Sequence, residues 1–191
     1  MSADKKTFLR CVTVLYDTRE QQNKHILDKL SELGILTEQR KLDYGDYSFT
    51  AGGKDFSLSC VIERKANVDE IYGNIMADFR DRENGKQGRF EKELQTASQL
   101  AKGFTVLLEG VSSWEDLKHC QVEKWQMEMS PQRKNRETGA MVYSTLKSWS
   151  SASRFGFGVE FVRDRKDTAA KMLEVFYYYW RNYKELTQAR R

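Results

Sequence analysis

The chain has 191 residues, of which 39% are hydrophobic, and it contains a single proline. That length fits one compact domain, and the composition excludes a long disordered or proline-rich region. A formal net charge of +4 permits binding to nucleic acid but does not establish it.

Segments with strand and helix patterns alternate along the chain. Runs of apolar or β-branched residues predict strands, whereas apolar residues at helical spacing predict helices. In chain order, we expect a strand over 11–16, a helix over 22–33, two strands or one bent strand over 35–42 and 46–50, a strand over 56–65, helices over 68–79 and 89–102, a strand over 104–108, helices over 114–119 and 142–155, a strand over 159–162 and a helix over 168–186. This order predicts an α/β sandwich around a mixed sheet.

Two polar stretches interrupt this pattern. Residues 78–87 carry dense charges of both signs, so we expect a loop or a frayed helix end there. Residues 123–137 lack clear periodicity, so we expect irregular structure. Neither stretch marks a convincing domain boundary, and we therefore expect a single domain.

The cysteines and the hydropathy pattern indicate the compartment. Cys11, Cys60 and Cys120 are isolated in sequence, so a disulfide framework or a structural zinc site is not expected and a reducing compartment fits best. No apolar run approaches the length of a membrane span, and the polar residues 1–6 lack a signal-peptide core. The sequence therefore predicts a soluble protein of the cytoplasm, with no membrane partner.

The most informative segment is 61–69, which reads V-I-E-R-K-A-N-V-D. Its two leading apolar residues predict the end of a buried strand. Because side chains alternate along a strand, Glu63 and Lys65 should point to one face and Arg64 to the other. A carboxylate beside an ammonium group suits metal-dependent attack on phosphate, since the acid can hold a divalent cation and the lysine can orient a water molecule or neutralise developing charge.

Further acidic residues follow the other expected strands. Asp17 and Glu20 come just after the first strand, and Asp46 follows Gly45, which permits an unusual backbone or a close approach. Ligands in α/β sheets bind beyond the strand ends, so these loops could converge there. For any one acid alone, a surface charge or a helix cap is the simpler interpretation. The combination at successive strand ends favours a metal site, because converging carboxylates repel one another unless a cation lies between them.

Residues 45–46 and 63–69 together resemble the G-D … E-R-K-x-x-x-D signature of XPF-type structure-specific nucleases. That resemblance implies a restriction-endonuclease-like fold of the PD-(D/E)xK superfamily, an α/β/α sandwich with a central mixed sheet. Weaker matches follow in the family's order: D-T-R-E at 17–20, G-R-F at 88–90 with E-L at 93–94, and V-L-L-E-G at 106–110. The resemblance covers roughly residues 11–185.

The resemblance implies a role for each candidate residue. Asp46 and Glu63 would be the principal metal ligands, and Lys65 would position or activate the attacking water, which makes these three the candidate catalytic residues. Asp17 and Glu20 would coordinate through water or help to hold a second ion. The expected supporting residues are Arg19, Arg64, Asp69 and Arg89, and the expected DNA contacts are Arg80, Arg82, Lys86 and Lys92.

The implied activity is Mg²⁺- or Mn²⁺-dependent endonucleolytic hydrolysis of phosphodiester bonds, in branched, flapped or distorted DNA. Two alternatives stay open: a nuclease with little structure preference that acts on duplex DNA, and a non-catalytic DNA-binding or scaffold subunit of a nuclease heterodimer. Inactive relatives usually lose the acids of the E-R-K segment, whereas this chain keeps them, which speaks against the scaffold.

No helix-hairpin-helix signature follows the nuclease core, so we expect one nuclease domain over residues 1–191, of the stand-alone form known in bacteria and phages. The aromatic segment 175–183 would form a homodimer interface in preference to a base-stacking surface, because Trp180 and several tyrosines exceed what one helical stripe needs. For Arg133, Lys134 and Arg136, phosphate contact and an ordinary solvated surface are equally compatible with the sequence.

Overall fold

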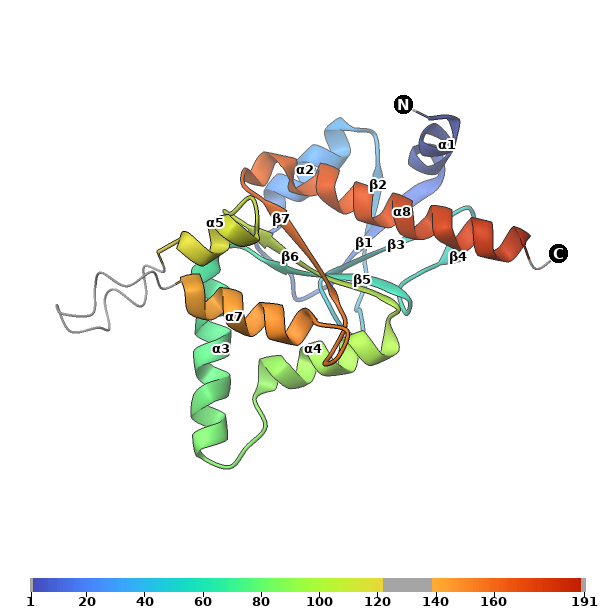
Figure 1. Ribbon diagram of the computed structural model, residues 1–191. Helices are drawn as coiled ribbons and strands as arrows, with labels where there is room; N and C mark the ends of the chain where they lie inside the picture. The colour runs from blue at the N-terminus through green and yellow to red at the C-terminus, as the bar shows by residue number, and fades with distance from the viewer. Residues whose placement is uncertain (1, 122–138, 190–191) are drawn as a thin grey trace. The chain divides into compact units, whose positions relative to one another are not determined.

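A mixed sheet of seven strands is formed by the residues that the computed structural model describes, 2–121 and 139–189 (Figure 1). The strands are β1 (Val12–Tyr16), β2 (Leu36–Gln39), β3 (Tyr47–Ala51), β4 (Lys54–Asp55), β5 (Cys60–Lys65), β6 (Gly103–Glu109) and β7 (Gly158–Val162). Their order is β2-β1-β3-β5-β6-β7, with β4 paired to β3. Strand β1 runs parallel to β2 and antiparallel to β3, and β3 runs antiparallel to β5. Helices flank the sheet, so the predicted α/β fold with a central mixed sheet is confirmed.

The chain divides into two compact units. Unit 1 comprises residues 1–63, 100–105 and 165–191, and unit 2 comprises residues 64–99 and 106–164. Strands β5 and β6 contribute residues to both units. The single nuclease domain expected over residues 1–191 stays a prediction. The irregular structure expected over 123–137 lies outside the described residues, as do Arg133, Lys134 and Arg136.

Unit 1 is built around an aromatic core. Its helices are α1 (Ala3–Cys11), α2 (Lys24–Glu32), the short 3-10 helix η2 (Arg165–Asp167) and α8 (Thr168–Gln188), and α8 packs against α1, α2 and β3 (Figure 1). The ring of Phe49 stacks on Phe56 and on Phe176, with centroids 4.5 and 4.8 Å apart. Offset stacking of buried rings adds to the stabilisation that burial of their apolar area already provides.

Helix α1 was not expected from the sequence, and it changes how the C-terminal aromatic residues are explained. Only Phe8 of this helix is buried, so its sequence carries almost no helical stripe. The Phe8 ring contacts Tyr177 and Trp180, whose centroids lie 5.7 and 5.4 Å away. These aromatic residues beyond the main stripe of α8 are therefore covered by α1. The homodimer through the C-terminal helices stays a prediction.

Unit 2 contains α3 (Val68–Glu83), most of α4 (Arg89–Leu100), α5 (Trp114–His119) and α7 (Gly139–Ser150), with α7 packed against α3 and α5. Helix α3 continues four residues beyond the expected end at position 79, so of the two alternatives expected for 78–87 the loop is wrong for 78–83, which form the end of the helix. Dense charge does not end a helix whose charged side chains lie on its solvent side. The helix stops at Asn84 and Gly85, and Gly85 has the positive φ of 71° that often ends helices.

No helix among residues 2–121 and 139–189 combines the length and the apolar character needed to cross a membrane.

Candidate active site

Two backbone hydrogen bonds link the end of β1, the start of β3 and the middle of β5 within unit 1. The N–H of Asp17, just after β1, donates to the carbonyl of Asp46 at 2.8 Å, and the N–H of Asp46, just before β3, donates to the carbonyl of Ile62 at 2.9 Å. Glu63 is the next residue of β5, and its side chain is 5% exposed. The structure thus brings the backbones of Asp17, Asp46 and Glu63 to one edge of the sheet, although they are far apart in sequence.

Gly45 permits this arrangement because its backbone lies directly against β5. Its φ is +70°, which favours glycine, and a Cβ built on it would lie 2.2 Å from Val61 Cγ1 and 3.1 Å from the Ile62 carbonyl oxygen. Any side chain at this position would push the loop away from β5 and move Asp46 with it. The G-D pair of the sequence signature therefore has a steric basis in this fold.

Asp17 fastens the end of β1 to the loop that precedes Asp46. Its carboxylate is buried, with Oδ1 accepting from the Arg19 N–H at 2.8 Å and from Arg19 Nε at 2.6 Å, and Oδ2 accepting from the Leu42 N–H at 2.7 Å. Burial raises the pKa of this carboxyl, but the hydrogen bonds from Arg19 and Leu42 outweigh it, so the pKa lies below the usual value. These contacts make Asp17 a structural clamp, and its expected part in metal coordination stays a prediction.

Arg19 and Glu20 continue this turn. Arg19 also donates from Nη2 to the Leu42 carbonyl at 3.2 Å, which ties the same two segments together a second time. The Oε1 atom of Glu20 accepts from the Gln22 N–H at 2.8 Å. Arg19 therefore braces this turn, while its expected supporting role in the reaction and the expected metal contact of Glu20 stay predictions.

Arg64 forms a buried, bidentate ion pair within unit 2. Its Nε and Nη2 donate to Oε1 and Oε2 of Glu109 at 3.0 and 2.8 Å, and the two side chains are 3% and 0% exposed. Strand alternation places Arg64 on the opposite face of β5 from Glu63 and Lys65. Sequence reasoning missed Glu109, although an acid that directly follows the apolar run of β6 is a signal for a buried cation partner.

Lys65 lies between an acid and an aromatic ring. Its Nζ is 3.6 Å from Glu70 Oε1 and 4.8 Å from the centroid of Phe90, and its side chain is 9% exposed. The other oxygen of Glu70 accepts from the Ala66 N–H at 2.8 Å, so Glu70 also fastens the end of β5 to the first turn of α3. Sequence reasoning missed Glu70. Asp69 lies in the same first turn of α3, where a negatively charged side chain stabilises the helix through its dipole.

Gly88 and Asp78 explain the G-R-F segment that opens α4. The buried Asp78 carboxylate accepts from the N–H groups of Phe90 and Glu91 at 3.0 and 2.6 Å, which caps α4 from α3. A Cβ on Gly88 would lie 2.3 Å from Asp78 Cγ, so only glycine fits here. Arg89 then begins α4 with an exposed side chain.

The residues expected to contact DNA lie around the end of α3 and the start of α4. Arg80, Arg82, Lys86 and Lys92 are all exposed. Arg82 forms an ion pair with Glu91, which also pairs with Arg154. The DNA contacts of these residues stay predictions, and the pairing of Arg82 reduces the charge that it can offer to a phosphate.

The acidic residues at this end of the strands match the number of protein donors that Mg²⁺ takes when water and substrate oxygens complete its shell. Within residues 2–121 and 139–189, no group of three or more Asp, Glu, His and Cys side chains could hold a metal by itself. Mg²⁺ is commonly bound through one or two carboxylates, with water and substrate phosphate oxygens completing its shell. The half-buried Asp46 and the adjacent Glu63 provide two carboxylates. By contrast, both oxygens of Asp17 already accept hydrogen bonds from N–H groups.

A mixed α/β sheet with the G-D and E-R-K segments at neighbouring strand ends defines an XPF-type nuclease domain. Residues 16–175 match the family model of the ERCC4 domain, and the chain belongs to this family of DNA nuclease domains. No curated protein matches the chain at a significant level.

Solved structures of XPF from Aeropyrum pernix resemble the chain. One has a TM-score of 0.59 at 17% sequence identity, with the match covering 92% of this chain and 69% of that one. The same protein in complex with DNA has a TM-score of 0.54 at 18% identity, covering 89% of this chain and 65% of that one. At such identities the likeness supports the shared fold, and the chain spans about two thirds of these structures.

Proposed function

We propose that the protein is a divalent-metal-dependent endonuclease that hydrolyses phosphodiester bonds in branched, flapped or otherwise distorted DNA. The observation that carries this proposal is the backbone hydrogen bond from the Asp46 N–H to the Ile62 carbonyl, because it brings Asp46 beside Glu63, the next residue of β5 and the second proposed metal ligand. The ERCC4 family membership supports DNA as the substrate, and the solved complex of the Aeropyrum pernix XPF with DNA agrees with it.

In this proposal Asp46 and Glu63 hold Mg²⁺ or Mn²⁺ through their carboxylate oxygens. When bound, the ion polarises the scissile phosphate and lowers the pKa of a water molecule. Lys65, two residues after Glu63 on β5, orients the attacking water and offsets charge that develops on the phosphate. The contacts of the Lys65 ammonium group with Glu70 and Phe90 restrict the positions that this positive group can take. Arg89 binds the DNA backbone together with the exposed cations of α3, of α4 and of the connection between them: Arg80, Arg82, Lys86 and Lys92.

We further propose that the protein acts in the cytoplasm and as a homodimer that uses α8. The exposed side chains of α8 include Tyr178 and Leu186, which are 51% and 64% exposed. Sedimentation of the full chain over a range of concentrations tests the dimer, and a profile that stays monomeric throughout would contradict it.

The activity is tested with labelled flap, fork, four-way junction and duplex DNA, each incubated with the purified chain in Mg²⁺ or in EDTA. We expect cleavage in Mg²⁺ only, with faster cleavage of the branched substrates. Equal rates on all substrates would favour a nuclease with little structure preference. If no substrate is cleaved but DNA is bound, the chain is instead a non-catalytic subunit and the enzyme proposal fails.

A further inference from the structure

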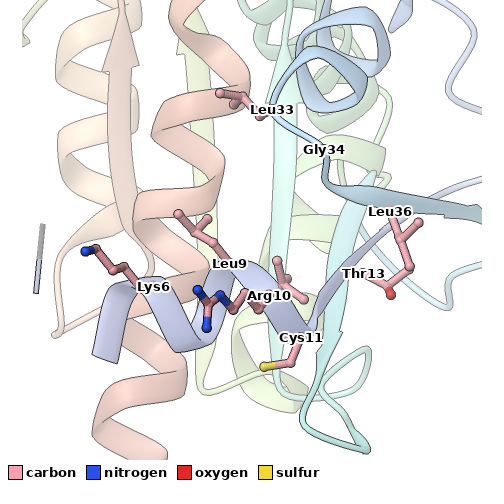
Figure 2. A pocket seen from close by; sticks show the side chains of 9 residues that line it. Lys6, Leu9, Arg10, Cys11, Thr13, Leu33, Gly34 and Leu36 are labelled. Atoms are coloured by element: carbon pink, nitrogen blue, oxygen red, sulfur yellow. The ribbon is translucent and has the colours of Figure 1, made fainter. Parts of the chain in front are cut away.

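A cavity of about 530 Å³ lies in unit 1, remote in sequence from the E-R-K segment (Figure 2). It is lined by α1, by the start of β1 and by the turn that joins α2 to β2. Cavities of this size can bury a small ligand or the anchoring side chains of a partner. None of the residues proposed above for catalysis, metal binding or DNA contact lines it. The cavity therefore has no role in the proposed nuclease reaction.

Two exposed leucines border this cavity. Leu33 is 49% exposed and Leu36 is 70% exposed, whereas Ile35 between them is 6% exposed and belongs to the core. Figure 2 shows Leu33, Leu36 and Leu9 of α1 around the same space. Large apolar side chains that share one surface hollow indicate an interaction site more strongly than scattered ones do.

The cavity adjoins an open edge of the sheet. Strand β2 stands at one end of the strand order, all four of its residues are exposed, and no strand of the described residues pairs with its outer side. The Arg40 N–H donates to the Tyr16 carbonyl at 3.0 Å, so it faces β1. Because successive backbone groups alternate in direction, the N–H and carbonyl groups of Thr37 and Gln39 face away from β1. This edge can accept the backbone of another extended chain.

The charge of the lining restricts what can bind. Lys6 and Arg10 are four residues apart on α1 and therefore lie on one face of it, and both line the cavity (Figure 2). No acid is among the described residues that line it. A segment with carboxylates beside its apolar side chains complements this pattern. Nucleic acid fits less well, because its phosphates would have to lie against Leu33 and Leu36.

We propose that the outer edge of β2 and the adjoining cavity bind an extended, acidic and aliphatic segment of a partner protein by strand addition. Its backbone pairs with Thr37 and Gln39, one aliphatic side chain enters the cavity beside Leu36, and its carboxylates meet Lys6 and Arg10. The backbone bonds supply affinity, while the cavity and the two cations supply selectivity.

The test starts from a library of random peptides that is selected on the immobilised full chain and counter-selected on the Leu36→Asp variant. We expect the retained peptides to share alternating aliphatic residues flanked by Asp or Glu. One retained peptide then serves as the probe for affinity measurements and for amide hydrogen exchange followed by NMR. With the peptide bound, exchange should slow by at least about tenfold at Thr37 and Gln39, the two amides that face outward.

Matched variants separate this site from general surface effects. Leu36→Asp and the double variant Lys6→Glu/Arg10→Glu should each weaken peptide binding by at least about tenfold. Leu58→Asp and Lys102→Glu, at exposed positions of unit 1 that do not line the cavity, should change it by less than about twofold. All five positions are exposed, so the variants should keep the melting temperature of the parent chain.

Several results would overturn the proposal. A selection that enriches no peptide, or that enriches basic peptides, would remove the occupant that we propose. Slowed exchange elsewhere than β2 would place the binding on another surface. Slowed exchange at Thr37 and Gln39 with labelled duplex DNA would make this edge a nucleic-acid contact. Self-association that Leu36→Asp abolishes would identify the occupant as a second copy of the chain.

Discussion

Gly45 lies so close to Val61 that a Cβ on Gly45 would come within 2.2 Å of Val61 Cγ1. This contact couples the loop that carries Asp46 to the strand that carries Glu63. This steric contact explains why the G-D segment lies against β5 although the two are separated in sequence, and its importance can be tested directly.

We expect Gly45→Ala to lose most of its cleavage activity, because the added methyl group pushes Asp46 away from β5. The left-handed backbone costs an alanine about 1–2 kcal/mol, and the steric clash adds to that cost. Gly52→Ala is the matched control, since Gly52 also has a positive φ of 58° but has no atom within 4 Å of the added Cβ. Cleavage rates and urea unfolding of both variants separate the clash from the backbone strain. Equal activity of the two variants would contradict the steric explanation.

We expect Asp46→Asn and Glu63→Gln each to abolish cleavage while leaving DNA binding and folding nearly unchanged. Loss of a metal ligand removes several kcal/mol of transition-state stabilisation, which corresponds to about a thousandfold or more in rate. Asp43→Asn, at an exposed acid three residues before Asp46, is the control and should keep full activity. Mn²⁺ titration by calorimetry gives a readout independent of cleavage. Full activity in both variants would show that the site lies elsewhere.

We expect Glu109→Gln to destabilise the fold by about 3–5 kcal/mol, because it removes the charge of Glu109 from its bidentate pair with the buried Arg64 guanidinium. The double variant Arg64→Met/Glu109→Leu should recover much of that loss, since it removes both buried charges. Arg181→Ala is the control: its ion pair with Glu185 is about half exposed, and breaking it should cost about 1 kcal/mol or less. Urea unfolding of the four proteins measures these differences. A Glu109→Gln variant as stable as the Arg181→Ala variant would contradict this prediction.

Asp17 should make stability depend on pH in the acidic range. Its pKa is lower in the folded chain than the ordinary value of 3.8, so its contribution is fully present above that value and is lost as the pH falls through the folded pKa. Unfolding measured in EDTA from pH 7 downward should therefore show stability that drops below about pH 3.8. Asp17→Asn should be less stable at neutral pH, and the difference from the parent should shrink towards low pH. If the stability difference between Asp17→Asn and the parent were the same at every pH, the charge of Asp17 would not be what stabilises this turn.

The sequence predicted most accurately those helices and strands whose limits depend on the local residue pattern. The helix over 114–119 and the strand over 159–162 were found almost to the residue, because each has clear periodicity and end signals. Helix α1 was missed because it buries only Phe8. The end of α3 was placed too early because dense charge was interpreted as a loop, when the buried Asp78 in fact caps α4.

For the candidate site, the sequence indicated Asp46, Glu63 and Lys65 through the G-D and E-R-K segments, but not the residues that contact them. The catalytic and metal-binding roles of these three residues stay predictions. Glu109 and Glu70 were missed because their function depends on which cation they meet, and Arg64 lies 45 residues from Glu109 in sequence. No local pattern encodes a pairing over that distance. For Asp17, the sequence predicted its place after the strand. It did not predict the three hydrogen bonds that the Asp17 carboxylate accepts from N–H groups.

The cap that Asp78 forms on α4 has a consequence for protein engineering. Because the start of α4 is fixed by a side chain of α3, the intervening residues 84–87 do not determine where α4 begins. These residues are exposed and include Gly85, at which a Cβ would meet nothing within 4 Å. The connection is therefore a suitable place to insert a fluorophore or an affinity handle beside the exposed cations without displacing either helix.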